Sequence, residues 1–163
     1  MLMFVLYIFL RESLMIRISR MADYALLVVF KMRNLDELIT LSGLCELTHL
    51  PLPTIRKLMR ALTKSNLVKS VRGPHGGYRL SRQPDQTSIA EVIEAIDGPI
   101  ALTECAKLDG GDCQIASTCE LKENWNIVNR LISNALHNVT LDAMGHVPFD
   151  IKQLNSELIK VPN

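Results

Sequence analysis

Hydrophobic residues recur every three or four positions in several stretches of the chain, and this period predicts amphipathic helices. The first predicted helix covers residues 20–32, with Ser19 placed to cap it. A short second helix fits residues 41–48. A third begins near Pro53, since a proline is tolerated in the first helical turn, and runs to about residue 65. The expected buried stripes are Met21, Tyr24, Ala25, Val28 and Val29, then Leu41, Leu44, Cys45 and Thr48, then Ile55, Leu58, Met59 and Leu62.

A β-hairpin is predicted directly after the third helix. Residues 67–72 and 77–80 have the pattern of strands, and the glycines and proline of residues 73–77 supply the turn between them. A short helix, a tight turn, a second helix and a hairpin form a winged helix-turn-helix, whose second helix enters the DNA major groove. The expected fold class is therefore mainly α, a winged helix-turn-helix with a two-stranded wing and a long C-terminal dimerisation helix.

Two further helices are predicted after the wing. The first covers residues 88–96 and is expected to close the core with Ile89, Val92, Ile93 and Ile96. The second covers residues 120–138 and has more apolar surface than a small winged helix needs, so we expect it to pair with the same helix of a second subunit. Packing back on its own domain is the alternative. The expected dimerisation residues are Leu121, Trp125, Val128, Ile132 and Leu136.

Charge divides the chain in two. The net charge of the 163 residues is only +1, but residues 17–82 hold 12 basic and 4 acidic residues, a net of +8. Residues 83–163 have a net charge of −7. A basic half joined to an acidic half indicates that the basic half faces an anion such as nucleic acid. Two ordinary solvated surfaces are the alternative.

Candidate DNA contacts follow from this basic half. In the third helix Arg56, Arg60 and Lys64 are spaced by four and lie on one face, with Lys57 beside them. Like charges at this spacing repel one another, and phosphates would offset the repulsion. Arg72 and His75 at the wing tip could reach phosphates or a minor groove, although His75 fits equally well as a polar turn residue.

The first sixteen residues do not fit the rest of the chain. Residues 1–10 are continuously apolar, but a membrane span needs about 20 such residues, and no basic segment precedes them as in a secretory signal. We interpret residues 1–14 as a mis-assigned upstream extension, with Met15 or Met21 as the true start; a hydrophobic appendage is the alternative. Without an export signal, the expected location is the cytoplasm, and no membrane partner is expected.

Three cysteines form a C-x7-C-x5-C array in a loop-like segment, at Cys105, Cys113 and Cys119. In a reducing compartment such clustered cysteines are more often metal ligands than disulfides. Thiolates suit zinc, copper(I) or iron–sulfur clusters, and the lack of a C-x2-C pair disfavours a zinc finger. The nearby acidic residues disfavour freely reactive thiols. Cys45 is expected to be a small core residue.

These features together resemble the Rrf-type winged-helix transcription regulators, over about residues 15–142. The resemblance rests on Arg17-Ile18-Ser19, on Asp23-Tyr24-Ala25, on the wing sequence R-G-P-x-G-G-Y and on the three downstream cysteines. The opening R-I-S-R-M-A-D-Y-A is most similar to the regulators of SUF-type iron–sulfur assembly genes. The resemblance implies a homodimer that binds a palindromic operator in double-stranded DNA.

The resemblance also implies an iron–sulfur cluster held by Cys105, Cys113 and Cys119, with two irons preferred and four allowed. IscR-like members use a histidine three positions after the last cysteine as fourth ligand, but Lys122 stands there in this chain. NsrR-like members use an aspartate in the first helix of the other subunit, and Asp23 occupies that position. Stabilising charge near a helix N-terminus is the alternative role of Asp23.

The expected domains are an extension (1–16), a winged helix (17–98), a cysteine loop (99–119), a dimerisation helix (120–141) and a tail (142–163). The expected function is a regulator of SUF-type iron–sulfur assembly genes that senses cluster status. A nitric-oxide-responsive repressor of the same family is the first alternative. A redox or interaction module that does not bind DNA is the second. Because no catalytic constellation or phosphate loop is present, neither an enzyme nor a small-molecule substrate is expected.

Overall fold

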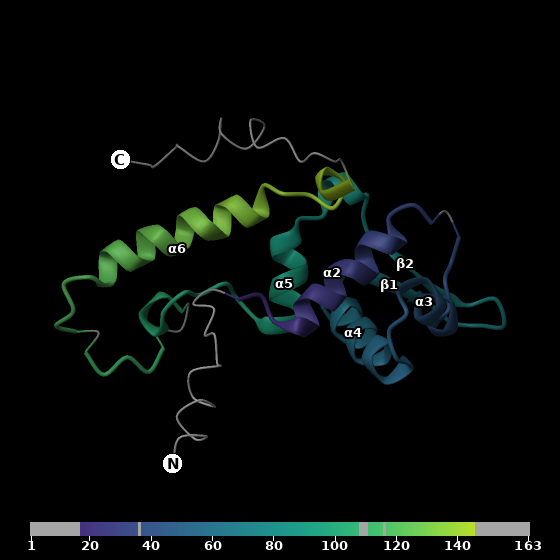
Figure 1. Ribbon diagram of the computed structural model, residues 1–163, viewed down its shortest axis with the longest axis horizontal. Helices are drawn as coiled ribbons and strands as arrows, with labels where there is room; N and C mark the ends of the chain where they lie inside the picture. Colours follow the sequence, from purple (N-terminus) through teal and green to yellow (C-terminus); the bar gives the residue numbers. More distant parts are fainter. Residues whose placement is uncertain (1–16, 36, 108–110, 116, 146–163) are drawn as a thin grey trace, which may run out of the picture.

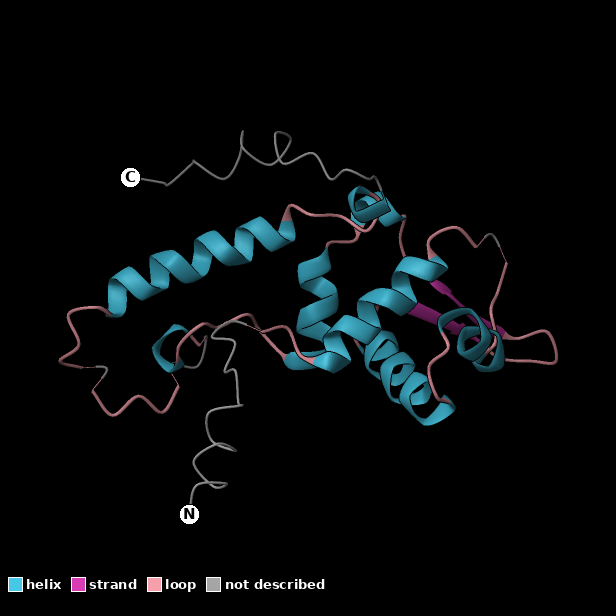
Figure 2. Ribbon diagram, in the orientation of Figure 1, coloured by secondary structure: helices cyan, strands magenta, loops and turns pink. Residues whose placement is uncertain are grey.

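The computed structural model describes residues 17–35, 37–107, 111–115 and 117–145. Helices form most of the body, and a small antiparallel hairpin lies at one end, as Figures 1 and 2 show. The elements are α2 (Arg20–Met32), α3 (Leu41–Thr48), α4 (Leu52–Lys64), β1 (Val68–Val71), β2 (Gly77–Leu80), α5 (Ile89–Asp97) and α6 (Lys122–His137), with short 3-10 turns η1 (Pro84–Gln86), η2 (Glu104–Ala106) and η3 (Ala143–Gly145). The predicted fold class, a mainly helical winged helix-turn-helix, is confirmed.

Side-chain caps and a left-handed residue set the ends of α2 and α3. The hydroxyl of Ser19 accepts a hydrogen bond from the backbone N–H of Ala22 at 3.0 Å, as the sequence predicted. Thr40 caps α3 in the same way, and His49 ends that helix in the left-handed region at φ 57°. Pro51 then precedes α4 as its N-cap residue, and a second proline, Pro53, lies in the first turn of the helix. A proline is tolerated there because the N–H groups of the first turn have no partner within the helix.

The wing is a two-stranded antiparallel sheet joined by a tight glycine turn. In its register Lys69 pairs with Arg79 and Val68 pairs with Leu80. A single bridge between Ile39 and Tyr78 ties β2 to the segment before α3. Gly77 is required at this crossing, because a Cβ atom there would lie 2.8 Å from the carbonyl oxygen of Ile39.

The core lies where α2, α4 and α5 meet, with α3 and the base of the wing beside them. The stripes predicted for these helices supply it, and Cys45 packs partly buried against it as expected. Its fully buried side chains include Val28, Val29, Leu44, Ile55, Leu58, Met59, Leu62 and Val92. Burial of such side chains contributes about 1.5–3 kcal/mol each, which makes this core the main source of stability.

The segment after α6 returns to the body and completes the core. The long helix predicted over residues 120–138 is α6, which ends at His137. The backbone N–H of Leu141 donates to the carbonyl of Thr87 at 2.9 Å, and the N–H of Ile89 donates to the carbonyl of Val139 at 2.9 Å. Leu141 is 1% exposed. The chain is therefore anchored directly after α6, which extends away from the body (Figure 1).

Apart from the gaps given above, residues 17–145 contain no helix that is long and apolar enough to cross a membrane. The expected extension and all but the first four residues of the expected tail lie outside the described residues.

Candidate DNA-binding face and cysteine loop

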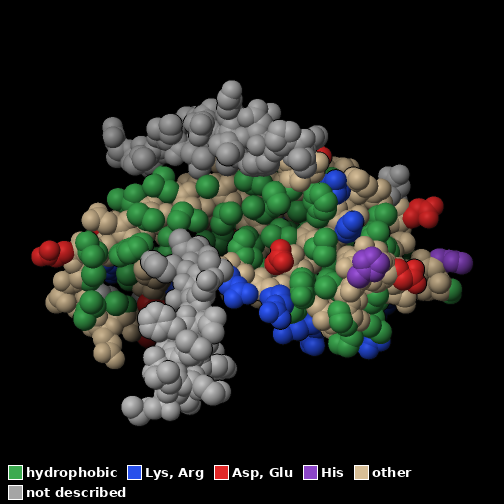
Figure 3. Space-filling view, in the orientation of Figure 1, with side chains coloured by type: hydrophobic (Ala, Val, Ile, Leu, Met, Phe, Trp, Pro, Cys, Tyr) green, Lys and Arg blue, Asp and Glu red, His purple; other side chains and the backbone are tan. Residues whose placement is uncertain are grey.

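Helix α4 separates a buried apolar face from an exposed basic face. Ile55, Leu58 and Leu62 are fully buried. The cationic residues predicted as DNA contacts are all exposed; they are Arg56, Lys57, Arg60 and Lys64. Lys and Arg side chains gather along the lower edge of the body, where α4 lies in Figure 3. The structure therefore presents the predicted cations together on one helix that the core holds rigidly.

The wing tip projects Arg72 and His75 into solvent. Both side chains are exposed. Gly73 has φ 129°, and its carbonyl accepts a hydrogen bond from the N–H of Gly76 at 2.9 Å, which closes the turn. Within the described part of the chain, Arg72, His75 and the four α4 cations form no ion pair. The charges of Arg72 and of the four α4 cations are thus available to an external anion.

The cysteine loop begins at η2, which packs against α6. Cys105 lies in η2 with its Sγ 3.3 Å from the hydroxyl oxygen of Thr103, and Lys107 forms an ion pair with Glu104 at 2.6 Å. Gly111, at φ 53°, lies directly against the backbone carbonyl of Glu104, so a side chain at that position would collide with it. The second part of the loop is thereby held beside the segment that carries Cys105.

All three loop cysteines are free thiols that are only partly exposed. Three thiols are a donor set that fits an iron–sulfur cluster, because soft thiolates are the ligands such clusters use. Outside the gap at residues 108–110 and the other masked positions, however, no three His, Cys, Asp or Glu side chains lie close enough together to hold a metal ion. The donor types fit the group, whereas the described residues do not gather them around one point.

Asp23 lies in the first turn of α2 and is exposed. It lines a groove of about 240 Å³ with mainly apolar neighbours, and no cysteine is among the described residues that line it. Those neighbours include Leu26, Phe30, Leu141 and Met144. Asp23 thus faces a surface of its own subunit that is separate from the cysteine loop.

The predicted dimerisation stripe on α6 is divided between two directions. Trp125, Ile132 and Leu136 line a pocket of about 470 Å³ together with Ile18 and residues 97–102 of the same chain. Leu121, the residue that precedes α6, is 58% exposed, and Val128 on the helix is 39% exposed. No described residue of α6 is buried, and Figure 3 shows hydrophobic side chains along its surface. One part of the stripe thus lines a pocket of its own chain, although Trp125 is 39% exposed, as Val128 is, and the other part faces solvent.

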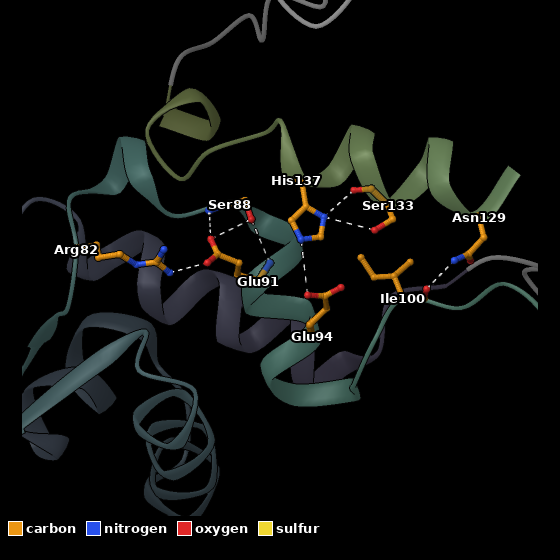
Figure 4. A network of polar contacts seen from close by, with 8 residues as sticks. All are labelled: Arg82, Ser88, Glu91, Glu94, Ile100, Asn129, Ser133 and His137. Atoms are coloured by element: carbon orange, nitrogen blue, oxygen red, sulfur yellow. Dashed lines mark hydrogen bonds and ion pairs between the residues drawn. The ribbon is translucent and has the colours of Figure 1, made fainter. Parts of the chain in front are cut away.

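A polar side chain that the sequence reasoning missed attaches α6 to the loop. Asn129 accepts a hydrogen bond from the N–H of Leu102 at 2.9 Å. It also donates one to the carbonyl of Ile100 at 3.0 Å, which Figure 4 shows. Nearer the end of α6, His137 lies 3.7 Å from Glu94 of α5. The sequence does contain a sign of this role. Asn129 lies four positions after Trp125, on the apolar face of the helix, where it interrupts the stripe that continues at Ile132.

A capping box begins α5 and contains the one described group with a shifted pKa. Glu91 accepts a hydrogen bond from the backbone N–H of Ser88 at 2.9 Å and forms an ion pair with Arg82 at 2.6 Å (Figure 4). Partial burial raises the pKa of Glu91, but the hydrogen bond from Ser88 and the bond and charge of Arg82 outweigh this, so its pKa lies below the ordinary value. The carboxylate therefore links the segment after the wing to α5.

Comparison with known proteins agrees with this geometry. Residues 18–146 match the Rrf2 family, described as iron-dependent transcriptional regulator. A Vibrio campbellii protein described as HTH-type transcriptional regulator IscR is 36% identical over 103 residues, which cover 63% of this chain and 60% of that protein. An Aliivibrio salmonicida protein with the same description is 34% identical over the same shares. The chain thus spans about three-fifths of the length of these relatives.

Solved structures show the same fold. The structure of T. potens IscR matches with a TM-score of 0.60 and 27% identity, over 79% of this chain and 85% of that one. The global cysteine regulator CymR of B. subtilis matches with a TM-score of 0.57 and 25% identity, over 78% and 94%. These relatives are transcriptional regulators rather than enzymes, as the sequence predicted. Since the family match covers most of the chain, the protein belongs to the Rrf2 family of transcriptional regulators.

Proposed function

We propose that this protein is a DNA-binding transcriptional regulator that senses iron–sulfur cluster status and controls SUF-type iron–sulfur assembly genes. Two observations together carry the proposal. The cationic face on α4 and the wing forms no ion pair with any residue that the structure describes. Three free cysteines lie in one loop that Asn129 attaches to α6. The relatives described as IscR support it.

DNA recognition is proposed for α4 and the wing. Helix α4 enters the major groove, with Arg56, Lys57, Arg60 and Lys64 available to phosphates and base edges. Arg72 extends from the wing toward the adjacent minor groove, where the negative potential attracts arginine. A protein of this kind reads a palindromic operator as a dimer, because the two-fold symmetry of the protein is mirrored in the site.

Homodimerisation is proposed for α6. Its exposed apolar residues, Leu121 and Val128 among them, would be buried by the same helix of a second subunit. The pocket lined by Trp125, Ile132 and Leu136 lies beside this helix and gives the partner further apolar surface. A cytoplasmic location, in which thiols stay reduced, is part of the same proposal.

The cluster ligands are proposed to be Cys105, Cys113 and Cys119, with a two-iron cluster preferred and a four-iron cluster allowed. Asp23 of the partner subunit is proposed as the fourth ligand. Its support is that the Asp23 carboxylate is exposed and borders the apolar face of α2 formed by Leu26 and Phe30, on which a second subunit could seat. A bound cluster would supply the sensing chemistry, because the protein would gain or lose it according to iron–sulfur status.

The chain's own residues would connect that loop to the DNA-binding body. Asn129 holds Ile100 and Leu102, which lie just before Cys105, against the middle of α6. The return segment at Val139 then attaches the end of α6 to the start of α5. A change of order in the cysteine loop is therefore expected to alter how the two α6 helices set the spacing of the two α4 helices.

Footprinting on a palindromic promoter upstream of iron–sulfur assembly genes tests this function. We expect a symmetric protected region that the double variant Arg56→Ala, Arg60→Ala no longer produces. The absence of any footprint with well-folded wild-type protein would favour a redox or interaction module. Titration of the cluster-bearing protein with nitric oxide distinguishes a nitric-oxide sensor, whose operator affinity would change at low nitric oxide concentration.

A further inference from the structure

A second basic surface lies away from α4, on the outer side of the wing. A pocket of about 530 Å³ is formed there by the end of α2, by the strands β1 and β2, and by the segment that follows β2. Four cationic side chains line it, and they come from four different segments: Arg33, Lys69, Arg79 and Arg82. None of the α4 cations is among its described lining residues. We propose that this pocket is a binding site for a compact, multiply charged phosphate-bearing small molecule.

The register of the wing places two of the cations opposite each other. Lys69 and Arg79 are direct partners across the antiparallel pair, and both are exposed. Val68, one position earlier, is buried in the core, so the alternation of a strand directs Lys69 to the outer face. Like charges that face each other across a strand pair destabilise the sheet. An anion bound between them removes this repulsion.

The other two cations are held in place by their own chain. A guanidinium nitrogen of Arg33 donates to the carbonyl of Phe30 at 2.9 Å, and the group lies 3.6 Å from the centre of the Phe30 ring. Arg82 is fixed by its 2.6 Å ion pair with Glu91. A guanidinium has five N–H donors, so each of these arginines keeps donors for a ligand. Arginines positioned in advance lose less conformational entropy when they bind an anion.

An unpaired hydroxyl is an independent indication of a missing ligand. The Oγ of Ser81 is buried, and it has no hydrogen-bond partner among the described residues. A buried polar group without a partner is unfavourable, and native proteins rarely leave one. Ser81 lines the same pocket as the four cations, and a serine hydroxyl is a donor that a phosphate oxygen accepts.

The composition of the pocket selects the class of ligand. No acidic residue is among its described lining residues, and Gln83 and Gln86 add amide donors to the cations. One carboxylate, that of Glu91, neutralises Arg82 from outside the lining. Arginine and lysine side chains that line one pocket suit phosphate oxygens. We assign the pocket to a small molecule rather than to the backbone of a DNA duplex, because no α4 cation is among its described lining residues and the exposed face of α4 is available to DNA.

Isothermal titration calorimetry of the full chain with inorganic pyrophosphate, at constant ionic strength, tests this site. We expect saturable binding of one pyrophosphate per chain. Lys69→Gln and Arg79→Gln should each weaken it about tenfold or more, since each removes a charge-assisted hydrogen bond. Ser81→Ala should weaken it less. Arg56→Gln on α4 is the matched control, because it removes the same charge from an exposed position outside the pocket, and it should bind pyrophosphate as the wild type does.

Three outcomes would overturn the proposal. The first is the absence of saturable binding by wild-type protein that circular dichroism shows to be folded. The second is an equal loss of affinity in Arg56→Gln and Arg79→Gln, which would indicate nonspecific attraction by the whole basic half. The third is that Lys69→Gln and Arg79→Gln reduce the salt dependence of DNA binding without changing pyrophosphate binding, which would assign these cations to the DNA backbone. Because pyrophosphate binding is measured without DNA or iron, its result is separate from that of the proposed regulator function.

Discussion

Asn129 in the middle of α6 accepts a hydrogen bond from the backbone N–H of Leu102 at 2.9 Å. Leu102 stands three positions before the first loop cysteine, and the same asparagine side chain also donates to the carbonyl of Ile100. A single side chain thus satisfies two backbone groups of the segment that leads into the cysteine loop. Helix α6 and the start of the loop therefore behave as one unit.

Replacement of Asn129 by alanine should break this unit. The N–H of Leu102 and the carbonyl of Ile100 would both lose their partner, and we expect a loss of about 1–3 kcal/mol in the free energy of unfolding. Urea denaturation measures it. Asn134→Ala on the exposed part of the same helix is the control and should cost less than about 0.5 kcal/mol. Equal effects of the two substitutions would remove the special role of Asn129.

Glu91 should make stability depend on pH in the acid range. Its pKa in the folded protein is lowered from the ordinary value of 4.5, so its contribution is complete above that value and is lost as the pH falls through the lower pKa of the folded state. Glu91→Gln should lose about 0.2–1 kcal/mol near neutral pH, because it removes the charge that pairs with Arg82 while a glutamine can still complete the capping box. It should also show a weaker decline of stability in acid.

Chemical denaturation of the Glu91 variant at several pH values measures both effects. Glu46→Gln is the control, because Glu46 is exposed and forms no ion pair among the described residues. A stability difference between wild type and Glu91→Gln that stays constant from neutral pH to pH 3 would contradict the role of this carboxylate.

Arg72→Ala should weaken operator binding by about 1–3 kcal/mol if the wing reads a groove or a base. Arg130→Ala, which removes an exposed arginine from α6, is the control and should change affinity little. Fluorescence anisotropy with labelled operator at one salt concentration compares them. Wild-type affinity in Arg72→Ala would remove the wing from the recognition mechanism.

Asp23→Ala should change the absorption spectrum of the cluster-bearing protein. An oxygen ligand among sulfur ligands alters both the charge-transfer bands and the stability of the cluster. Asp85→Ala removes another exposed carboxylate and should leave the spectrum unchanged. If the spectrum of Asp23→Ala also equals that of the wild type, the remaining role of Asp23 is favourable charge at the start of α2.

Local patterns predicted the winged helix well, because each helix carries its own apolar stripe and its own cap. Ser19, Pro53 and the glycines of the wing act on residues within a few positions, so the sequence reveals them directly. The long-range contacts were not predictable in this way. The pairing of Leu141 with Thr87 depends on where α6 directs the chain, and a three-residue segment has no period to read.

The same distinction applies to the candidate sites. The cations of α4 share one helix face, so their spacing alone predicts that they lie together. Arg33 and Arg82 are far apart in sequence and line one pocket only because the wing and α2 pack side by side. The spacing of apolar residues predicted the stripe of α6. It did not predict which of these residues line a pocket with the loop at residues 97–102, because that depends on where the loop packs.

Anaerobic purification followed by iron and sulfide analysis, with the loaded and stripped forms compared on operator DNA, tests the central claim most directly. We predict equal amounts of iron and acid-labile sulfide in the wild type, their loss when Cys105, Cys113 or Cys119 is replaced by alanine but not when Cys45 is, and a difference in operator affinity between the two forms. Wild-type protein without stoichiometric iron and sulfide, or with one operator affinity in both forms, would contradict the account.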